Sequence, residues 1–373
     1  MAGRVLRLRA LWGRLPENRI EVLLLWVCGL AFGAFAFWST RDLPLPVALA
    51  CWAAVAGLGL GLALRAEPIL WEEATPDPES PAAREPDPPP SPRIPPLLDL
   101  VQVPGGTFRM GSPPATEGQI AAFARDWAEA LDKQPQEAID DVRRWLEREQ
   151  PAHQVRLSPF LMARVPVTRG QWWTVLSAGP EEWSQTGDDA DLPATHVDWP
   201  QSLAFCNALS AREGLTPCYR KDEQGEWHWD RTADGYRLPT EAEWESACRA
   251  GAETQWFWGD DPAGAEKYAW YRGNAGGSLK PVRSKAANPW GLHDMSGLVY
   301  EWCWDRFGAY SGETEPPTLD PVGPEEGDSR VVRGGSFFLP PFILRSADRF
   351  DFRPDFRAGR LGLRCVRSRA RQP

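Results

Sequence analysis

Two long apolar runs near the start of the chain dominate its hydropathy pattern. Residues 22–38 and 47–64 carry no charged side chain, and each is close to the roughly 17–25 apolar residues that cross a bilayer as a helix. The connector between them is short, so residues 20–65 predict a transmembrane hairpin of two helices. A cleaved signal peptide fits poorly, because two runs occur and no small-residue cleavage site follows the first. Buried helices of a soluble domain are the alternative.

The arginines around this hairpin predict its orientation. Residues 1–19 form a basic arm with five arginines, whereas the connector holds only Arg41. Because basic residues stay on the cytoplasmic side of a bilayer, the N-terminus is expected in the cytoplasm, and two crossings return the chain to that side. The sequence therefore predicts a multi-pass protein of a bacterial-type inner membrane, with its C-terminal domain in the cytoplasm.

Residues 66–96 have the composition of a spacer. Between residues 67 and 96 the chain contains eleven prolines and seven acidic side chains, with little that is apolar. Such a segment cannot bury enough apolar surface to fold, so we expect an extended, polyproline-type linker.

From residue 97 to residue 373 the apolar positions recur at short intervals between turns, which predicts one loop-rich α+β domain. Residues 101–112 alternate around Gly105 and Gly106 and predict a β-hairpin. Residues 200–212 carry apolar side chains at the spacing of one helical face. Thr240 and Glu243 form a capping box that begins another helix.

Charge and cysteine usage narrow the possible partners. The chain has 51 acidic and 41 basic residues and a net charge of −10 at pH 7. We expect no nucleic acid partner, because phosphate binding requires a concentrated basic surface. The seven cysteines include no CxxC pair, which favours buried free thiols in a reducing compartment.

Five blocks of sequence carry a resemblance to a known family. They are VPGGTFRMGS, EQPAHQVRLSPF with VPVTRGQW, YRLPTEAEWESACRAG, NPWGLHDMSGLVYEW, and RVVRGGSF through GLR. In this order they resemble the signatures of the formylglycine-generating enzyme (sulfatase-modifying factor) family. The resemblance covers about residues 97–367 and implies a C-type-lectin-like α+β fold with much irregular structure.

Residues 113–149 depart from the family pattern because the stretch is longer than usual. Apolar side chains recur there at helical spacing, including Phe123, Trp127, Val142 and Trp145, which predicts an inserted pair of amphipathic helices. The insertion is expected either to pack as an appendage or to act as a lid.

The resemblance implies a copper site that this sequence lacks. In the family, two cysteines just after the RGGS segment bind copper as thiolates, and soft sulfur ligands suit Cu(I). Here Ser336 is followed by Phe337, Phe338 and Leu339, and no cysteine occurs before Cys365. We therefore predict no catalytic residues, no required cofactor and no enzymatic activity. The alternative is a metal-dependent oxidase or modifying enzyme of this family that uses an unrecognised site.

The resemblance also implies a calcium site near the turn before a family Trp-Glu-Trp motif. The matching residues are Glu301, the backbone carbonyls of Gly297 and Val299, and Asn274. Hard oxygen ligands suit Ca²⁺. The alternative is a structural role in which Glu301 accepts hydrogen bonds from backbone amides.

The segment 336–364 combines aromatic residues, arginines and prolines without the period of a strand or a helix. It resembles the variable region of diversity-generating retroelement variable proteins. The resemblance makes Arg345, Arg349 and Arg364 scaffold, held by carbonyls and acidic partners. It implies thirteen variable, ligand-binding positions: Phe338, Leu339, Pro340, Phe342, Ile343, Asp348, Phe350, Asp351, Phe352, Phe356, Ala358, Gly359 and Arg360.

A coding argument supports this interpretation. Such systems change adenines, so an Asn codon AAC becomes any codon ending in C, and the residues at the template Asn positions all belong to that set. Aromatic and arginine side chains are also the usual anchors of binding surfaces. The predicted function is a membrane-anchored receptor that displays a diversified surface to a protein or other macromolecular ligand. The alternatives are aromatics that belong to the core, and a module that recruits partners through its helical insertion.

Overall fold

The computed structural model describes residues 96–183 and 189–368. The basic arm predicted at 1–19, the hairpin at 20–65 and the linker at 66–96, except its last residue, lie outside these ranges. Among the helices that are described, none is both long and apolar enough to cross a bilayer. The predicted multi-pass inner-membrane localisation is therefore corrected: no described helix supports it, and membrane anchoring has no part in the function proposed below.

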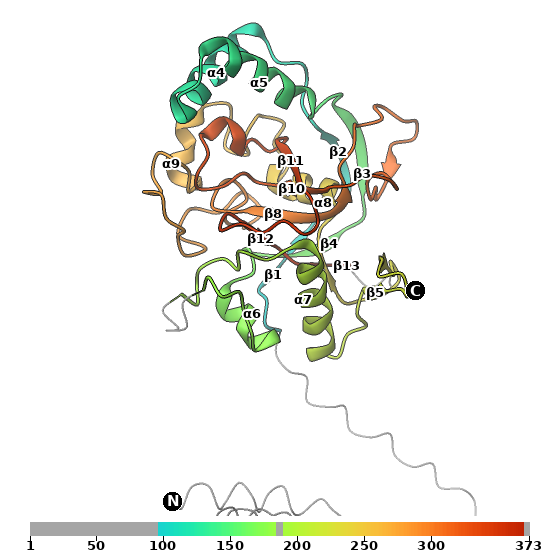
Figure 1. The fold of residues 1–373 in the computed structure, drawn as a ribbon. Helices are drawn as coiled ribbons and strands as arrows, with labels where there is room; N and C mark the ends of the chain where they lie inside the picture. Colours follow the sequence, from blue (N-terminus) through green and yellow to red (C-terminus); the bar gives the residue numbers. More distant parts are fainter. Residues whose placement is uncertain (1–95, 184–188, 369–373) are drawn as a thin grey trace, which may run out of the picture. The chain divides into compact units, whose positions relative to one another are not determined.

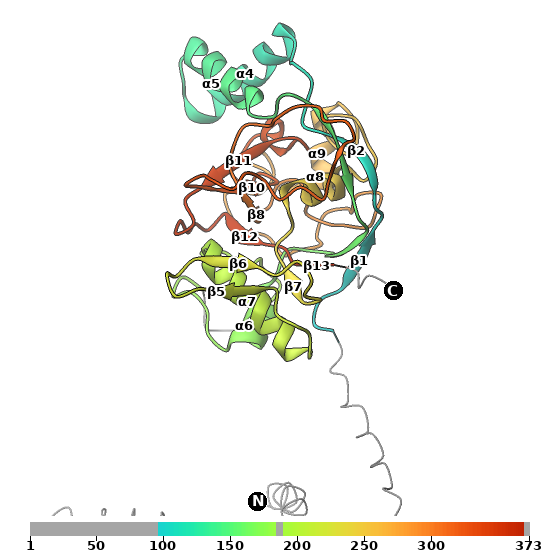
Figure 2. The ribbon, with the colours of Figure 1, turned by 90° about the vertical axis from the view of Figure 1, so that its right-hand side faces the viewer.

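The described residues mix short helices and short strands, which confirms the α+β class (Figures 1 and 2). The helices are α4 (Glu117–Leu131), α5 (Pro135–Glu147), α6 (Arg169–Leu176), α7 (Trp199–Arg212), α8 (Glu241–Arg249) and α9 (Ala265–Tyr268), with the 3₁₀ turns η1 (Pro262–Gly264) and η2 (Pro341–Leu344). The first seven strands are β1 (Leu100–Val103), β2 (Gly106–Met110), β3 (His153–Leu157), β4 (Phe160–Ala163), β5 (Tyr219–Lys221), β6 (Trp227–Trp229) and β7 (Tyr236–Arg237). The others are β8 (Tyr300–Arg306), β9 (Thr318–Leu319), β10 (Arg330–Arg333), β11 (Arg349–Phe352), β12 (Leu361–Leu363) and β13 (Val366–Ser368).

The sheet that presents the C-terminal segment has the strand order β11-β10-β8-β12. Strand β11 is antiparallel to β10, β10 is antiparallel to β8, and β12 is parallel to β8. A second sheet, β1-β4-β13-β7, joins the beginning of the domain to its end, and β2-β3-β9 and β5-β6 form smaller sheets. Both ends of the segment 336–364 are therefore fixed next to the same central strand, β8.

The hairpin predicted at residues 101–112 is not formed. Strand β1 pairs with β4 and β2 pairs with β3, and both pairs keep the same antiparallel register, from Leu100 opposite Ala163 to Met110 opposite His153, with an interruption at residues 104–105. The Gly105–Gly106 step bends this ribbon instead of reversing the chain. A Cβ on Gly105 would lie 2.7 Å from the carbonyl oxygen of Leu157, so the bend requires glycine at that position.

The predicted helix starts are confirmed, because they depend on local chemistry. The hydroxyl of Thr240 accepts from the backbone N–H of Glu243, and the Glu243 carboxylate accepts from the backbone N–H of Thr240. Asp198 and Gln201 form the same reciprocal box at the start of α7. Such boxes satisfy amide groups that a helix N-terminus otherwise leaves unpaired.

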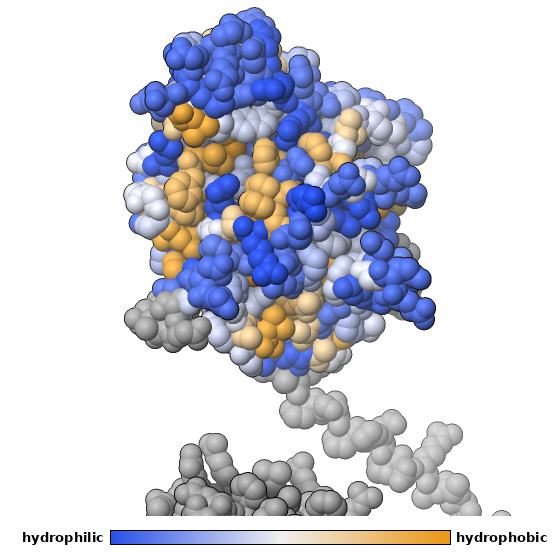
Figure 3. Space-filling view, in the orientation of Figure 1, coloured by the Kyte–Doolittle hydropathy of each residue, from blue (hydrophilic) through white to orange (hydrophobic). Residues whose placement is uncertain are grey.

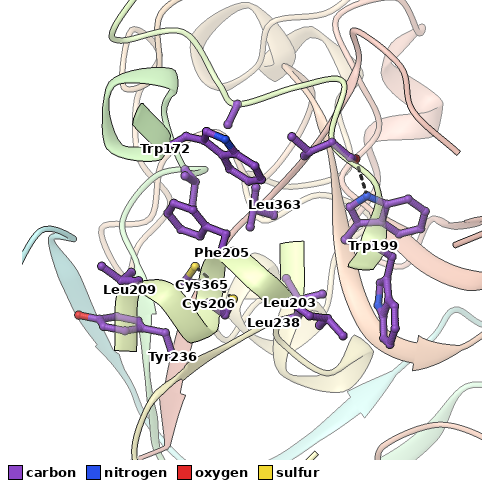
Figure 4. Packing of buried hydrophobic residues seen from close by; sticks show 14 of the residues in the cluster. Trp172, Trp199, Leu203, Phe205, Cys206, Leu209, Tyr236, Leu238, Leu363 and Cys365 are labelled. Carbon is purple, nitrogen blue, oxygen red and sulfur yellow. Dashed lines mark hydrogen bonds between the residues drawn. The ribbon is translucent and has the colours of Figure 1, made fainter. Parts of the chain in front are cut away.

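Three clusters of buried apolar side chains fill the domain. In the cluster of Figure 4, the ring of Phe205 on α7 stacks on Trp172 with centroids 5.0 Å apart. The sulfurs of Cys206 and Cys365 face each other at 3.7 Å, and burial raises the pKa of the Cys206 thiol well above its ordinary value. The five cysteines of the described residues are free and buried, as the sequence predicts, and they pack as small apolar groups.

The predicted pair of inserted helices is confirmed as α4 and α5. Both views place them at one end of the domain, beside the segment that includes β11. Their apolar face packs against η2, where the ring of Phe342 stacks on Phe123 at 5.3 Å and meets Trp127 edge-on at 5.9 Å. The insertion thus shares a core with the C-terminal segment.

Four arginines between residues 333 and 364 are buried and paired with glutamates from other elements. Arg345 donates to both carboxylate oxygens of Glu149 at 2.7 Å. The other pairs are Arg333 with Glu245, Arg349 with Glu241 and Arg364 with Glu301. No side chain in these four pairs is more than 4% exposed. The expectation that Arg345, Arg349 and Arg364 are scaffold with acidic partners is confirmed.

Replacing Arg345 with alanine is expected to lower the free energy of unfolding by about 3–5 kcal/mol, because the change leaves the carboxylate of Glu149 buried without its cation. Equilibrium unfolding in urea measures this loss. Arg353→Ala is the matched control, since that side chain is 80% exposed and its ion pair with Asp355 is held in water. Equal losses for the two variants would contradict the scaffold role.

Candidate ligand-binding surface

Four aromatic side chains form a continuous row across one face of the domain. Trp145, in the last turn of α5, meets Phe350 of β11 with ring centroids 6.4 Å apart. Phe350 meets Phe352 at 5.1 Å, and Phe352 stacks on Phe356 at 4.3 Å. All four rings are half-buried. We call Trp145, Phe350, Phe352 and Phe356 the aromatic row.

The row lies on a rigid support. Phe350 and Phe352 are two positions apart on β11, so their side chains share one face of the sheet. Behind them the buried ring of Tyr300 lies 6.1 Å from each, and Trp302 lies 6.4 Å from Phe352. Figure 3 shows apolar side chains gathered on this face, between the polar insertion and the opposite end of the domain.

Four arginines are associated with the row: the guanidinium of Arg148 lies 5.3 Å from the ring centroid of Phe350, and three others follow Phe352 and Phe356 closely in the sequence. We call Arg148, Arg353, Arg357 and Arg360 the arginine rim. The first three pair with Asp351 at 3.3 Å, Asp355 at 3.4 Å and Asp198 at 2.6 Å, respectively. Within residues 96–183 and 189–368, no carboxylate lies within ion-pair distance of Arg360, which is exposed. Arg360 is therefore the member of the rim for which the described residues supply no carboxylate partner.

Tyr300, which supports the row, is also close to the rim: its backbone N–H donates to the carbonyl oxygen of Arg360 at 2.9 Å, and Arg148 lies over the neighbouring ring of Phe350. Burial and the nearby charge of Asp348 raise the pKa of the Tyr300 hydroxyl well above its ordinary value, while Arg360 and Arg148 act to lower it. The two guanidiniums therefore act on one hydroxyl, although they come from distant parts of the sequence.

The thirteen residues predicted to bind ligand fall into three groups. Phe338 and Arg360 are exposed, and Phe338 has 46% of its surface accessible. Seven are half-buried: Leu339, Phe350, Asp351, Phe352, Phe356, Ala358 and Gly359. Four are buried: Pro340, Phe342, Ile343 and Asp348.

Outward display is therefore wrong for the buried four. Phe342 and Ile343 belong to the apolar cluster under the insertion, which covers them. Asp348 lies 3.7 Å from the guanidinium of Arg345, but that guanidinium already pairs with Glu149. Burial, aided by the charge of Glu149, raises the pKa of Asp348 to about 8. These side chains stabilise the fold and are not available to a ligand.

A buried ionic group lies beneath β11. Arg349 donates to both oxygens of Glu241 at 2.6 and 2.7 Å. Asp305 accepts a 2.9 Å hydrogen bond from the backbone N–H of Glu241. Burial and the neighbouring charge of Glu241 raise the pKa of Asp305 to about 8. Asp305 is therefore mainly protonated at neutral pH, which spares this site a second buried negative charge.

The calcium site implied by the resemblance would use Glu301, Gly297, Val299 and Asn274. The carboxylate oxygens of Glu301 instead accept from the guanidinium of Arg364 at 2.7–3.1 Å and from the indole N–H of Trp244 at 2.7 Å. The side-chain oxygen of Asn274 accepts from a backbone N–H at 3.0 Å. Calcium requires oxygens that are free to coordinate it, so these residues do not fit the ion. Glu301 is a structural partner of Arg364, not of backbone amides.

The copper site does not fit either. Behind Ser336 the chain presents Phe337, Phe338 and Leu339, and the following turn η2 packs into an apolar cluster. The described residues hold no group of three or more His, Cys, Asp or Glu side chains with metal-binding geometry. The segment after Ser336 therefore supplies no thiolate for a copper ion.

Trp145 and Arg148 were not among the residues that the sequence nominated. Both follow the helical pattern of the insertion, in which Trp145 looks like an ordinary core position. One signal was available: Arg148 comes three residues after Trp145, directly beyond the C-terminus of α5, where side chains of consecutive turns share a face. Trp145 and Arg148 contact Phe350 although more than 200 residues separate them from it in the sequence. No local sequence pattern reveals such a contact.

Comparisons with known proteins agree with the fold. A model of the sulfatase-modifying factor enzyme 1-like domain matches residues 84–369. The chain is 34% identical over 214 residues to chaperone protein LppX of Paenibacillus barcinonensis, covering 49% of this chain and 71% of that protein. It is 30% identical over 308 residues to the formylglycine-generating enzyme of Thermomonospora curvata, covering 72% and 92%. Treponema denticola variable protein 1 is structurally similar, with a TM-score of 0.60 and 26% identity over 72% of this chain and 95% of that one.

These findings confirm both resemblances and correct one prediction. The sequence predicted that the protein is not an enzyme, because the family's cysteine pair is missing. A relative that aligns with most of the chain is named for an enzymatic activity, which contradicts that prediction. Loss of two cysteines removes one known chemistry and does not exclude another.

Asp305→Asn is expected to reduce the dependence of stability on pH. The folded-state pKa of Asp305 lies near 8, above the ordinary value of 3.8. Because the folded state holds the proton of Asp305 more tightly than the unfolded state, protonation stabilises the fold. This stabilisation is complete below about pH 4 and is lost as the pH rises through 8. Relative to the wild type, the Asn variant should gain melting temperature between pH 5 and pH 8.5. If the melting temperatures of the variant and the wild type change with pH by the same amount, the prediction is refuted. Asp355→Asn, at an exposed position, is the control.

Proposed function

This chain belongs to the family of sulfatase-modifying factor enzyme 1-like domains, and on that premise we propose that it is a ligand-binding protein. The binding surface is the aromatic row with the arginine rim, presented on a C-type-lectin-like scaffold. Its ligand is a protein or another macromolecule, because the row is an extended face and not an enclosed small-molecule pocket.

The observation that carries the proposal is the aromatic row. Its rings contact one another and remain partly exposed to solvent, next to guanidiniums that are also accessible. Aromatic and arginine side chains dominate the energetics of protein interfaces, because they bury large areas at little conformational cost. Single exposed apolar residues are common on any protein, but a contiguous row of them is typical of a binding surface.

The C-terminal segment separates two tasks at most of its positions: nine of the thirteen positions implied to vary retain exposed surface, while the other four are buried. Arg345, Arg349 and Arg364 are buried in ion pairs, while Phe352 and Phe356 contribute to the surface. Residues that change between copies of a protein must not be the ones that hold its fold together. The similarity to a protein named a variable protein supports this part of the proposal. A reverse transcriptase gene beside an adenine-rich near-copy of the segment's coding sequence is the genomic observation that tests it.

An enzymatic function is the second candidate, and the similarity to a formylglycine-generating enzyme favours it. The activity would be that of a metal-dependent oxidase or modifying enzyme with a site different from the family's cysteine pair. Metal analysis of the purified full chain, together with turnover of a cysteine-containing peptide, distinguishes the two candidates. Stoichiometric copper or iron with turnover would favour the enzyme.

The proposed surface can be tested with peptides selected against the full chain. A phage-displayed library of random dodecapeptides is panned on the wild type, and an enriched peptide is synthesised with a fluorescent label. The double variant Phe352→Ser/Phe356→Ser should raise the Kd of that peptide at least about thirtyfold, because even a single anchor of this kind contributes about 2 kcal/mol or more. Fluorescence anisotropy measures the Kd.

Leu319→Ser is the control, since Leu319 is 56% exposed on β9, outside the aromatic row. Thermal unfolding should show that the double variant still folds, with some loss of melting temperature because both rings are half-buried. A peptide that binds the double variant as well as the wild type would refute the proposed surface, as would a library from which nothing is enriched.

A further inference from the structure

We infer that the helical insertion is part of the binding surface: Trp145 and Arg148 contact the bound partner, and they select a protein segment with an aromatic side chain beside carboxylates. This inference rests on the proposed function and extends it from the C-terminal segment to a second, distant part of the chain. It replaces the two roles that the sequence left open for the insertion, appendage or lid.

The geometry places both side chains against ligand-binding positions. Trp145 meets the ring of Phe350 edge-on at 6.4 Å. The guanidinium of Arg148 lies 5.3 Å from the centroid of the same ring and 3.3 Å from the carboxylate of Asp351. Both Trp145 and Arg148 are half-buried, so each retains surface for a partner. A ligand that covers Phe350 therefore also reaches the insertion.

The C-terminal end of the insertion, next to Trp145 and Arg148, is held to the rest of the domain by hydrogen bonds and an ion pair. Next to Arg148, Glu149 is fully buried in its two hydrogen bonds with Arg345. The carbonyl oxygen of Arg148 accepts from Arg349 at 3.2 Å, and that of Glu149 accepts from the backbone N–H of Ser112 at 3.0 Å. A lid would need a free hinge at this point. These contacts instead make Arg148 part of a fixed wall, and side chains on rigid elements are suited to specific recognition.

The charge at this face determines the chemistry of the partner. Three of the four guanidiniums of the arginine rim are paired with aspartates, and Arg360 has no carboxylate partner among the described residues. Arg360 is therefore free to pair with a carboxylate of the partner, and Arg148 combines its guanidinium with the adjacent ring of Phe350. Carboxylates complement such a rim, and an aromatic side chain complements the row by ring stacking and by cation–π contact with Arg148.

The test uses the full chain and the peptide selected from the dodecapeptide library. Enriched peptides should contain an aromatic residue within a few positions of Asp or Glu. Arg148→Gln and Trp145→Leu should each raise the Kd at least about tenfold. Trp145→Leu keeps an apolar side chain packed against the core of the insertion. If Trp145→Leu nevertheless proves unstable, Arg148→Gln alone tests the inference. Arg144→Gln is the matched control, because Arg144 lies on the same helix with 71% of its side chain exposed and should leave the Kd unchanged.

A charge exchange makes the test specific to contact. Replacing the peptide carboxylate with lysine should weaken binding to the wild type and restore it with Arg148→Glu. If Phe352→Ser/Phe356→Ser weakens binding while Arg148→Gln and Trp145→Leu do not, the insertion is not part of the surface and the inference is overturned, although the proposed function stands. If the Phe352/Phe356 variant binds normally, the proposed function fails, whatever the insertion variants do.

Discussion

The whole C-terminal part of this domain depends on buried arginine–glutamate pairs. A guanidinium that is withdrawn from water is tolerated only with a well-placed carboxylate, because removing either partner leaves a buried charge. Arg345, Arg349 and Arg364 each meet that requirement with a glutamate from another element. The segment between them has regular structure only at β11 and β12, so these ion pairs act together with the ladder hydrogen bonds of those two strands to determine its path across the domain.

This manner of fixation leaves part of the surface of Phe350, Phe352 and Phe356 accessible to solvent, although their rings also pack against a core cluster. Phe356 belongs to the aromatic row and is partly exposed to solvent. Phe342, only fourteen positions earlier, is buried beneath the insertion. Phe342 lies in the 3₁₀ turn η2 and is a buried member of a core cluster, whereas Phe356 is half-buried and packs against another cluster. The same segment therefore combines positions that tolerate change with positions that do not, and the distinction is made by what lies above each side chain.

Sequence alone predicted the α+β domain, the capping box of Thr240 with Glu243, and the scaffold arginines, because each of these has a recognisable sequence pattern. It did not predict that Phe342 and Asp348 are buried, because the elements that bury them lie far away in the chain. The partner of Arg345 is Glu149, 196 positions distant. The bent ribbon at Gly105 was mistaken for a hairpin for the same reason, since alternation predicts strands but not which strands pair.

The proposed surface combines positions implied to vary with residues from outside the variable segment. If the positions of Phe350, Phe352 and Phe356 differ between copies, each new set of side chains still faces Trp145 and Arg148, which come from outside the segment. A fixed aromatic and a fixed guanidinium then contribute the same stacking and charge preference to every version of the surface. Specificity is a difference between the affinities for two partners, and only the variable positions of this surface could alter that difference. Diversification would therefore change which partner is bound, while every partner would still offer an aromatic side chain beside carboxylates.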